Sequence, residues 1–429
     1  MAINYRERII DRSLTEKMRI AWAILVRGPK RCWKTTTCKQ YAKSFVEIQE
    51  KDSSKWNPST IALSELQPSL LLKWDKPRLI DERQLAPDIW NTIRHDVDDS
   101  WLMWQYLLTG SATPNERDNS RLHTWTWRFA YINMKTMSLY ESGDSNWKIS
   151  LNDILNWERE INWITSDISY ERMAFLICRW WRPSIFNIED ENDQIKIADN
   201  YITSVCEIDI SAIDNVKRNP ELARAILESY ARLDSTIESN QTLIDDVLST
   251  NNVWESTINL YLSLFKKLYI LDEISARNPN IRSKTSIRTA PKKSFTDPSL
   301  AAALLNVSPE ELALDPNTYW LLFENLVDRD LSIYINSIWW TLNHYRDRYW
   351  LECDQVAHFR NGRYALIETK IWSERSIKEA EDHLLQLKKL INEKWRLRNP
   401  EFLMIVTNTP MAYITTSWIL VVPIGCLKN

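Results

Sequence analysis

The scarcity of glycine is the feature of this sequence that most limits how the chain can fold. Only 5 of the 429 residues are glycine, whereas 22 are tryptophan. Glycine normally supplies about 7% of a globular chain, because left-handed turns and close backbone approaches require it. Together the two residue types fill 27 positions, close to the usual share of glycine alone. We therefore hypothesise that many tryptophans stand where the natural protein has glycine, as a genetic code that reads UGA as glycine would produce.

The positions of the tryptophans favour this hypothesis over its alternative, a protein that is truly rich in tryptophan. Trp147 follows a Gly-Asp-Ser-Asn run, and Trp395 lies between two basic residues. Doublets occur at 180–181, before an Arg-Pro pair, and at 339–340, after a helical pattern. Such places at turns and helix ends are typical of glycine. Trp90 instead continues the apolar face of an expected helix, so we interpret it as a genuine tryptophan.

Composition and charge exclude several classes of protein. The chain has 54 basic and 57 acidic residues, and the net charge of −3 argues against a generally basic nucleic-acid binder. No run of about 18 apolar residues predicts a membrane span, and the first residues lack the apolar centre of a secretory signal. The six cysteines are scattered without zinc-binding spacing, which indicates reduced thiols in a cytoplasmic protein. The length predicts two or three domains.

Residues 28–35 match the phosphate-binding pattern GxxxxGK[ST], except that the second glycine is Trp33. An apolar strand precedes the pattern and a helix is expected after it. In such a loop backbone N–H groups surround the phosphates, Lys34 contacts the terminal phosphates, and the Thr35 hydroxyl holds Mg²⁺. An indole at position 33 would crowd the phosphates. The predicted nucleotide-binding residues of this loop are Gly28, Pro29, Lys30, Arg31, Cys32, Trp33, Lys34, Thr35 and Thr36.

Two further strands support a nucleotide site. The strand at 77–82 ends in an Asp-Glu pair, in which Asp81 would orient Mg²⁺ through water and Glu82 would polarise the attacking water. The strand at 105–111 ends near Thr109, which we place beside the nucleotide as a sensor residue, although ordinary turn chemistry explains its hydroxyl equally well. Arg128 follows soon after and is a candidate to contact a phosphate in its own or a neighbouring subunit; a solvated arginine is the alternative.

These motifs make the chain resemble prokaryotic predicted ATPases of the AAA+ superfamily that carry a C-terminal domain of unknown function. The resemblance extends over 28–37, 77–87, 107–114, 137–143, 282–284, 323–324, 351–370 and 421–428. Glycine is usual in that family where this chain has Trp33, Trp104, Trp125, Trp127, Trp147, Trp180, Trp181, Trp350 and Trp372. Conversely, the family commonly has tryptophan where this chain has Arg31, Arg83, Arg182 and Arg277, which suggests a second reassignment, of an arginine codon to tryptophan.

Residues 186–296 are expected to form a helical connector without a catalytic constellation. Apolar residues recur at helical spacing over 221–233 and 254–271. The family resemblance implies a helical lid that merges into a winged-helix-like module. A modest basic stretch, which we interpret first as a solvated linker and second as a nucleic-acid contact, contains Lys284, Arg288, Lys292 and Lys293.

The last third of the chain has the pattern of PD-(D/E)XK nucleases. Strands are expected at 351–356 and 364–370 with a turn between them, followed by a helix at 375–393 and a strand at 402–407. Asp354 and Glu368 would meet on adjacent strands and hold Mg²⁺, and Lys370 would stabilise the hydrolytic water. Glu324 is a candidate outer carboxylate. The alternatives are a binding scaffold that does not cut and a purely structural Asp354–Lys370 ion pair.

The sequence as a whole predicts an α/β protein of three parts. A P-loop parallel-sheet AAA+ domain covers 1–185, the winged-helix-like connector covers 186–296, and an α/β restriction-nuclease-like domain covers 297–429. ATP and Mg²⁺ are the expected cofactors. A DNA or protein partner and an oligomer remain open, and no membrane association is expected. The functional alternatives are an ATPase that gates a nuclease and a nucleotide-dependent binding module without nuclease activity.

Overall fold

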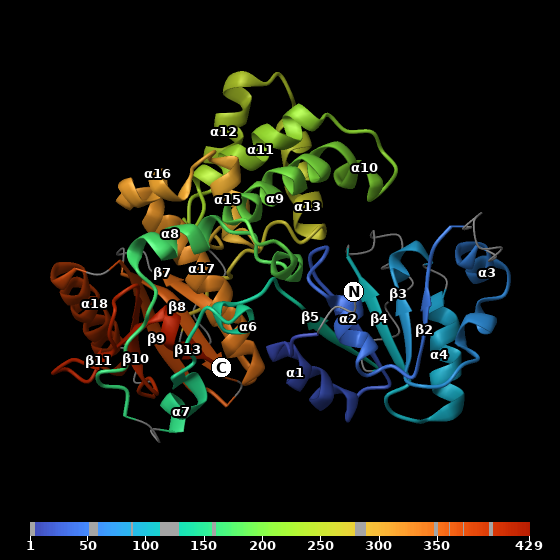
Figure 1. Ribbon diagram of the computed structural model, residues 1–429, viewed down its shortest axis with the longest axis horizontal. Coiled ribbons are helices and arrows are strands. Elements are labelled where there is room, and N and C mark those ends of the chain that lie inside the picture. The colour runs from blue at the N-terminus through green and yellow to red at the C-terminus, as the bar shows by residue number, and fades with distance from the viewer. Residues whose placement is uncertain are drawn as a thin grey trace. The chain divides into compact units, whose positions relative to one another are not determined.

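A computed structural model describes residues 5–50, 59–86, 89–111, 128–156, 160–278, 289–346, 351–359, 361–371, 373–393 and 398–429. The chain divides into two compact units (Figure 1). Unit 1 comprises 1–136, 211–216 and 264–270, and unit 2 comprises 137–210, 217–263 and 271–429. Among the described residues, no helix combines the length and apolar character needed to cross a bilayer. Several residues considered above lie outside the described ranges: Trp125, Trp127, Lys284, Arg288, Trp350, Trp372 and Trp395.

Unit 1 is built on a five-stranded sheet in the order β2-β3-β4-β1-β5, and all its strand pairs are parallel. The strands are β1 (Ala23–Arg27), β2 (Ser44–Glu47), β3 (Arg78–Asp81), β4 (Tyr106–Gly110) and β5 (Phe129–Asn133). Its helices include α1 (Ile9–Met18), α2 (Lys34–Lys39), α3 (Thr60–Leu66), α4 (Ile89–Ser100) and the short 3₁₀ turns η1 (Pro68–Leu72) and η2 (Arg83–Leu85). This confirms the predicted parallel α/β fold around the 28–35 loop.

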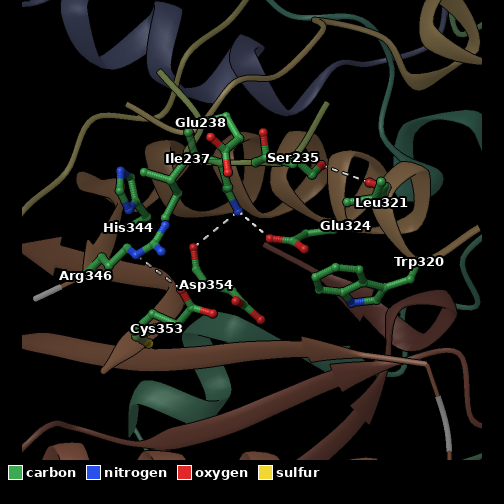
Figure 2. A pocket seen from close by; sticks show the side chains of 13 residues that line it. Ser235, Ile237, Glu238, Trp320, Leu321, Glu324, His344, Arg346, Cys353 and Asp354 are labelled. Carbon is green, nitrogen blue, oxygen red and sulfur yellow. Dashed lines mark hydrogen bonds and ion pairs between the residues drawn. The ribbon is translucent and has the colours of Figure 1, made fainter. Parts of the chain in front are cut away.

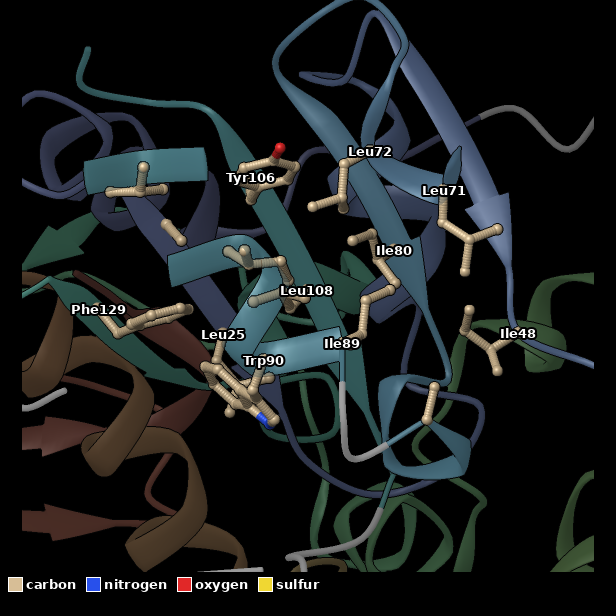
Figure 3. Close-up of a cluster of buried hydrophobic side chains, with 14 residues drawn as sticks. Leu25, Ile48, Leu71, Leu72, Ile80, Ile89, Trp90, Tyr106, Leu108 and Phe129 are labelled. Carbon is tan, nitrogen blue, oxygen red and sulfur yellow. The ribbon is translucent and has the colours of Figure 1, made fainter. Parts of the chain in front are cut away.

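The central strands β1, β3 and β4 are buried on both faces, because their side chains point alternately to the two faces and are apolar on both. On β1, Leu25 packs into one core cluster and Ile24 into the other. Figure 3 shows Leu25, Ile80 and Leu108 with Ile89 and Trp90 of α4 in the first cluster. The Trp90 ring contacts the Phe129 ring edge-on at 4.5 Å. Trp90 is therefore a core residue, as its apolar periodicity predicted.

Unit 2 contains a six-stranded mixed sheet in the order β11-β12-β10-β9-β8-β7. Its strands are β7 (Trp340–Arg346), β8 (Glu352–Phe359), β9 (Tyr364–Lys370), β10 (Leu403–Thr407), β11 (Tyr413–Ile414) and β12 (Leu420–Pro423). The β7-β8-β9 part is antiparallel, whereas β9, β10 and β12 run parallel. The amphipathic helix α18 (Glu374–Glu393) inserts Leu384 and Leu387 into the core of this sheet. These bounds agree closely with the strands and the helix expected from the sequence.

The remaining elements are mostly helical. The long helix α17 (Pro316–Ser337) packs against β7 and β9. A short two-stranded sheet joins β6 (Ile149–Ser150) to β13 (Leu427–Lys428). The other elements are α6 (Leu139–Ser142), α7 (Leu151–Asn156), α8 (Tyr170–Cys178), η3 (Pro183–Asn187), α9 (Glu191–Ser204), the π-helix η4 (Val205–Asp209), α10 (Ile210–Ala212), α11 (Pro220–Arg232), α12 (Asn240–Thr250), α13 (Glu255–Lys267), α15 (Pro298–Leu304), α16 (Pro309–Leu314) and η5 (Ile424–Cys426).

Tryptophan occupies an unusual share of the left-handed backbone positions. Of the 13 non-glycine residues with positive φ in the described part of the chain, seven are tryptophan. They are Trp33, Trp101, Trp104, Trp147, Trp163, Trp339 and Trp418, with φ between 48° and 73°. A bulky residue in this region costs roughly 1–2 kcal/mol, whereas glycine adopts it freely. This is the distribution expected of glycine. The doublet at 180–181 differs, since both residues are buried and neither has positive φ.

Candidate functional sites

The 28–35 loop follows the carboxyl end of β1 and continues into the first turn of α2. Gly28 begins the loop with φ 151°, and a Cβ there would lie 2.0 Å from the Met134 carbonyl oxygen. The Lys34 side chain is buried within the loop, and its Nζ donates to the Pro29 carbonyl at 2.6 Å. The lysine thus folds back onto the loop that precedes it.

Three hydroxyl and carboxylate side chains meet beside this loop. Thr35 Oγ1, from α2, donates to Asp81 Oδ1 at 2.7 Å. The Thr109 hydroxyl, from β4, donates to the same Asp81 oxygen. Because β3 and β4 are parallel neighbours, their carboxyl ends bring Asp81 and Thr109 together although 28 residues separate them. A hydroxyl beside a carboxylate oxygen supplies the hard oxygen ligands that Mg²⁺ prefers, so these residues fit such an ion.

Glu82 lies next to this group at the end of β3, in left-handed backbone with φ 52°. Its Oε2 accepts hydrogen bonds from Gln84 Nε2 and, at 3.3 Å, from Ser111 Oγ. The carboxylate is thus held at the same edge of the sheet as Asp81. The motifs in the sequence do not include Gln84, and only its position two residues after Glu82 could have indicated it.

The other loop residues have different surroundings. Cys32 is buried in the core cluster below the loop, while Arg31 is exposed and has φ 63°. Lys30 and Thr36 are half-buried. The Cys32 carbonyl accepts from Arg8 Nη1 at 2.9 Å, and Arg8 also donates to the Lys135 and Thr136 carbonyls. Arg8 therefore ties the loop to the chain after β5, a role that the sequence did not reveal.

Two further predicted site residues, Trp33 and Arg128, lie in different places: Trp33 is in the loop, and Arg128 is away from it. Trp33, at the N-cap of α2 with φ 73°, is half-buried and lies against the Tyr5 ring at 5.6 Å. Arg128 precedes β5, whose first residue pairs with the first residue of β1. It therefore lies at the amino edge of the sheet, opposite the loop, where its Nε pairs with Asp98 at 2.6 Å. The structure does not bring Arg128 to the phosphate loop of its own chain.

A second cluster of charged groups lies in unit 2, between α17 and the mixed sheet. Asp354 is on β8, and Glu368 and Lys370 are on the neighbouring strand β9. Lys370 Nζ lies 3.2 Å from Asp354 Oδ2 and 2.8 Å from Glu368 Oε2. The Thr369 N–H donates to Asp354 Oδ2 at 2.9 Å. The structure therefore brings the three predicted residues together.

Helix α17 supplies two further carboxylates to this cluster. Glu324 and Asp328 are one turn apart on the helix, so both lie on one face. Lys292 Nζ contacts Glu324 Oε1 at 2.8 Å, Asp328 Oδ2 at 2.5 Å and the Asp354 carbonyl at 3.3 Å. Glu324 and Asp354 both line a pocket of about 160 Å³. Figure 2 shows the two residues on this pocket. Asp328, which sequence analysis missed, could have been found only from its i+4 spacing to Glu324.

The buried lysine corrects one expectation from the sequence. Lys292 and Lys293 were interpreted as part of a solvated linker, yet each is only 2% exposed. Lys293 Nζ donates to the Glu238 carbonyl. A basic stretch indicates a solvated segment only when no acidic partner lies nearby. For Lys292 the partners are on α17, more than 30 residues along the chain, so the local pattern could not show them.

The electrostatics of this cluster separate its carboxylates. Burial, and then the charge of Asp354, raise the pKa of Glu368 well above its ordinary value. Burial likewise raises the pKa of Glu324 to about 8. Burial also opposes the ionisation of Asp354, but Lys370, Lys292 and the Thr369 N–H together lower its pKa below the ordinary value. Asp354 is thus the carboxylate of this cluster that holds its charge most firmly.

Two carboxylate oxygens in the cluster have unused hydrogen-bonding capacity. Glu324 Oε2 and Glu368 Oε1 are buried, and neither accepts a hydrogen bond. Buried oxygens of this kind fit a bound cation. Within the described ranges, however, no three Cys, His, Asp or Glu side chains are grouped as a ready metal centre. The ammonium groups of Lys292 and Lys370 lie between the carboxylates instead.

Comparisons with known proteins bear on the N-terminal region most directly. Residues 22–142 match the family described as an AAA domain, and residues 174–311 match a domain of unknown function (DUF8612). A search of the curated proteins finds no significant match.

Three solved structures are similar at low identity. A Walker-type ATPase of Pyrococcus abyssi is 11% identical, over 71% of this chain and 99% of that chain, with a TM-score of 0.44. A RuvB variant of Thermotoga maritima is 14% identical, over 61% and 86%, with a TM-score of 0.26. The FIGL-1 AAA domain in complex with ADP is 13% identical, over 62% and 92%, with a TM-score of 0.23. The family match and the parallel P-loop sheet agree that the N-terminal region is similar to AAA ATPases.

Proposed function

We propose that unit 1 binds and hydrolyses MgATP at the 28–35 loop. The observation that carries this proposal is the convergence of Thr35, Asp81 and Thr109 beside the buried Lys34. Lys34 would release the Pro29 carbonyl and bind the β- and γ-phosphates, and Thr35 and Asp81 would hold Mg²⁺. The metal would neutralise charge on the phosphates. Glu82 would orient a water for attack on the γ-phosphate, which releases ADP and inorganic phosphate.

Phosphate release by purified protein tests this assignment, with Trp33→Gly as the parent because the indole at position 33 crowds the phosphates. Lys34→Ala should lower the turnover rate by about 100-fold or more, because a lysine on the phosphates acts where charge develops. Lys43→Ala is the matched control, since Lys43 is exposed and outside the loop; it should retain the parent rate. Phosphate release that survives Lys34→Ala would rule out the proposed ATPase site.

We further propose that the active protein has glycine at position 33. The position has φ 73° and is the second glycine of the phosphate-binding pattern. An indole there occupies space that the phosphates need, whereas glycine lets the backbone approach them closely. Nucleotide binding by the chain as printed and by Trp33→Gly should differ, with affinity for MgATP gained in the variant. UGG at codon 33 of the coding DNA would contradict the recoding hypothesis, and UGA would support it.

The surroundings of Arg182 separately support the hypothesis that an arginine codon is read as tryptophan in the natural protein. Its side chain is fully buried, and none of its three guanidinium nitrogens makes a hydrogen bond. Its ion pair with Asp297 is long, at 3.7 Å. The guanidinium lies over the Trp180 ring at 3.9 Å and the Tyr201 ring at 4.3 Å. An aromatic side chain would fill this apolar space without leaving donors unsatisfied.

For the C-terminal part we propose a nuclease-like site in which Asp354 and Glu368 hold Mg²⁺ and Lys370 positions the hydrolytic water. The contacts of Lys370 with both carboxylates and the free Glu368 Oε1 support this arrangement. Coupling between ATP hydrolysis and this site, and the three-part division at 185 and 296, remain part of the proposal. A plasmid-nicking assay with Mg²⁺ or Mn²⁺ compares the parent with Asp354→Ala. Loss of nicking in the variant supports a nuclease, whereas no nicking by the parent favours a binding module.

A further inference from the structure

Lys292 is fixed in position before any ligand binds. It lies on a short two-stranded ladder in which residues 271 and 274 bridge to 295 and 292. Its backbone N–H donates to the Ile274 carbonyl at 2.9 Å, and its own carbonyl accepts from Ile274 at 3.0 Å. The side chain is 2% exposed and extends to the pocket shared by Glu324 and Asp354. The ladder therefore fixes the position of the Lys292 ammonium group in the cluster.

The ammonium of Lys292 is coordinated much as a small cation would be. It has three N–H donors and contacts three oxygens, from Glu324, Asp328 and the Asp354 main chain. Gln355 Nε2 donates to the other Asp328 oxygen at 2.8 Å and to Thr369 Oγ1 at 2.9 Å. These contacts fix Asp328 toward the lysine. Without a positive charge there, two buried carboxylates one helical turn apart would repel each other.

The remaining unused oxygens lie elsewhere in the cluster. Glu324 binds Lys292 through Oε1, and its Oε2 accepts no hydrogen bond. Glu368 Oε1 is likewise free of donors. The adjoining pocket of about 160 Å³ has room for several waters, each of which occupies about 30 Å³. A divalent ion in this pocket could thus reach Asp354, whose partner Lys370 also contacts Glu368, while the Glu324–Asp328 position is already filled.

We propose that Lys292 is a built-in substitute for a second divalent cation, so that the C-terminal cluster takes one metal ion, at Asp354 and Glu368. Lys292 is then a positioning residue, which holds the Oε1 side of Glu324 and leaves Oε2 available to the ion or its water shell. The inference rests on the nuclease-like metal site proposed above. According to this inference, Lys292, which lies outside the Asp-Glu-Lys motif, limits that site to one metal ion.

Counting bound Mn²⁺ tests the proposal without any activity measurement. The free ion is followed by electron paramagnetic resonance in a titration of the full chain without nucleotide, in an Asp81→Asn background that removes the N-terminal ligand. The parent should bind one ion, which Glu368→Gln abolishes. Lys292→Gln should bind one ion more, and the added Asp328→Asn change should remove the extra ion. Lys293→Gln, the loss of the adjacent buried lysine, should bind as the parent does.

The outcomes separate this inference from the proposed function. Equal ion counts for the parent and Lys292→Gln would overturn the inference. If the parent binds no ion but Lys292→Gln binds one, the substitution role of Lys292 stands and the nuclease-like metal site fails. If Lys292→Gln does not fold, the number of ions bound by the parent tests the inference. Two ions, one of which is lost in Asp328→Asn, would contradict it. A single ion that is still bound in Asp328→Asn would support it.

Discussion

The two candidate sites each contain a buried lysine, but the lysines have different partners. In unit 1, Lys34 donates to a backbone carbonyl within its own loop. In unit 2, Lys292 contacts two carboxylates on a helix more than 30 residues away in the chain. A carbonyl can be exchanged for a phosphate at small cost, whereas removing a lysine from two buried carboxylates leaves their charges unpaired.

This difference indicates what each lysine does before a ligand binds. In the first site the lysine is held by one backbone carbonyl, beside the hydroxyl groups and the carboxylate of Asp81, which suits the phosphate-binding role proposed above. In the second site Lys292 stabilises the fold by pairing with two buried carboxylates. We therefore expect loss of Lys34 to affect function far more than stability, and loss of Lys292 to affect stability directly.

The largest expected effect is the destabilisation caused by Lys292→Met. Removing one partner of a buried charge pair typically costs about 3–5 kcal/mol in the free energy of unfolding. Lys34→Met is the matched variant and should cost about 1 kcal/mol, the usual value of one hydrogen bond. Urea unfolding of the full chain, with each unit followed separately, measures both. Equal losses for the two variants would contradict the distinction between the sites.

The sequence allowed much of the first site to be predicted, because its residues belong to a short motif and to the ends of apolar strands. Lys34 and Thr35 belong to one short motif, and Asp81 ends an apolar strand that follows this motif at the expected distance. The parallel fold follows from the alternation of apolar strands and helices. Arg8 could not be predicted, because its contact with the Cys32 carbonyl depends on how α1 approaches the loop.

The second site was predicted in part, from residues on two adjacent strands and from Glu324 on α17. The spacing of Asp354, Glu368 and Lys370 indicated a shared hairpin, and the structure places them in contact. Lys292 was wrongly interpreted as solvated, because a charged residue shows its burial only through partners in space. Where an ionic cluster joins three distant segments, each segment by itself has an ordinary surface pattern.

A smaller effect concerns the pH dependence of unit 2. Burial, and then the charge of Arg277, lower the pKa of His358 to about 4, and its ring stacks on Tyr364. Neutral His358 thus stabilises the fold fully above the unfolded pKa of about 6.5, and this stability is lost as the pH falls toward 4. His358→Phe keeps the stacking but cannot titrate. The free energy of unfolding of His358→Phe minus that of the parent should therefore be about 2–3 kcal/mol larger at pH 4.5 than at pH 7.5.

Urea unfolding at several pH values measures this difference. His344, whose pKa burial also lowers to about 4, titrates in both proteins and cancels from the comparison. If the difference in free energy of unfolding between parent and variant is the same at pH 7.5 and pH 4.5, His358 is not held neutral in the folded protein.

The smallest expected effect tests the left-handed tryptophans one at a time, away from both sites. Trp163 is 76% exposed and has φ 66°, so its indole contributes little packing while its backbone is strained. Trp163→Gly should raise the free energy of unfolding by about 1 kcal/mol, because relief of strain exceeds the added entropy of the unfolded chain. Trp254 is the matched control, since it is 83% exposed but does not have positive φ. Trp254→Gly has no strain to relieve and should leave stability unchanged or lower it by a few tenths of a kcal/mol. A gain in both variants would show that exposed indoles, rather than left-handed backbone, limit the stability of the chain, and the backbone argument for glycine at these positions would then fail.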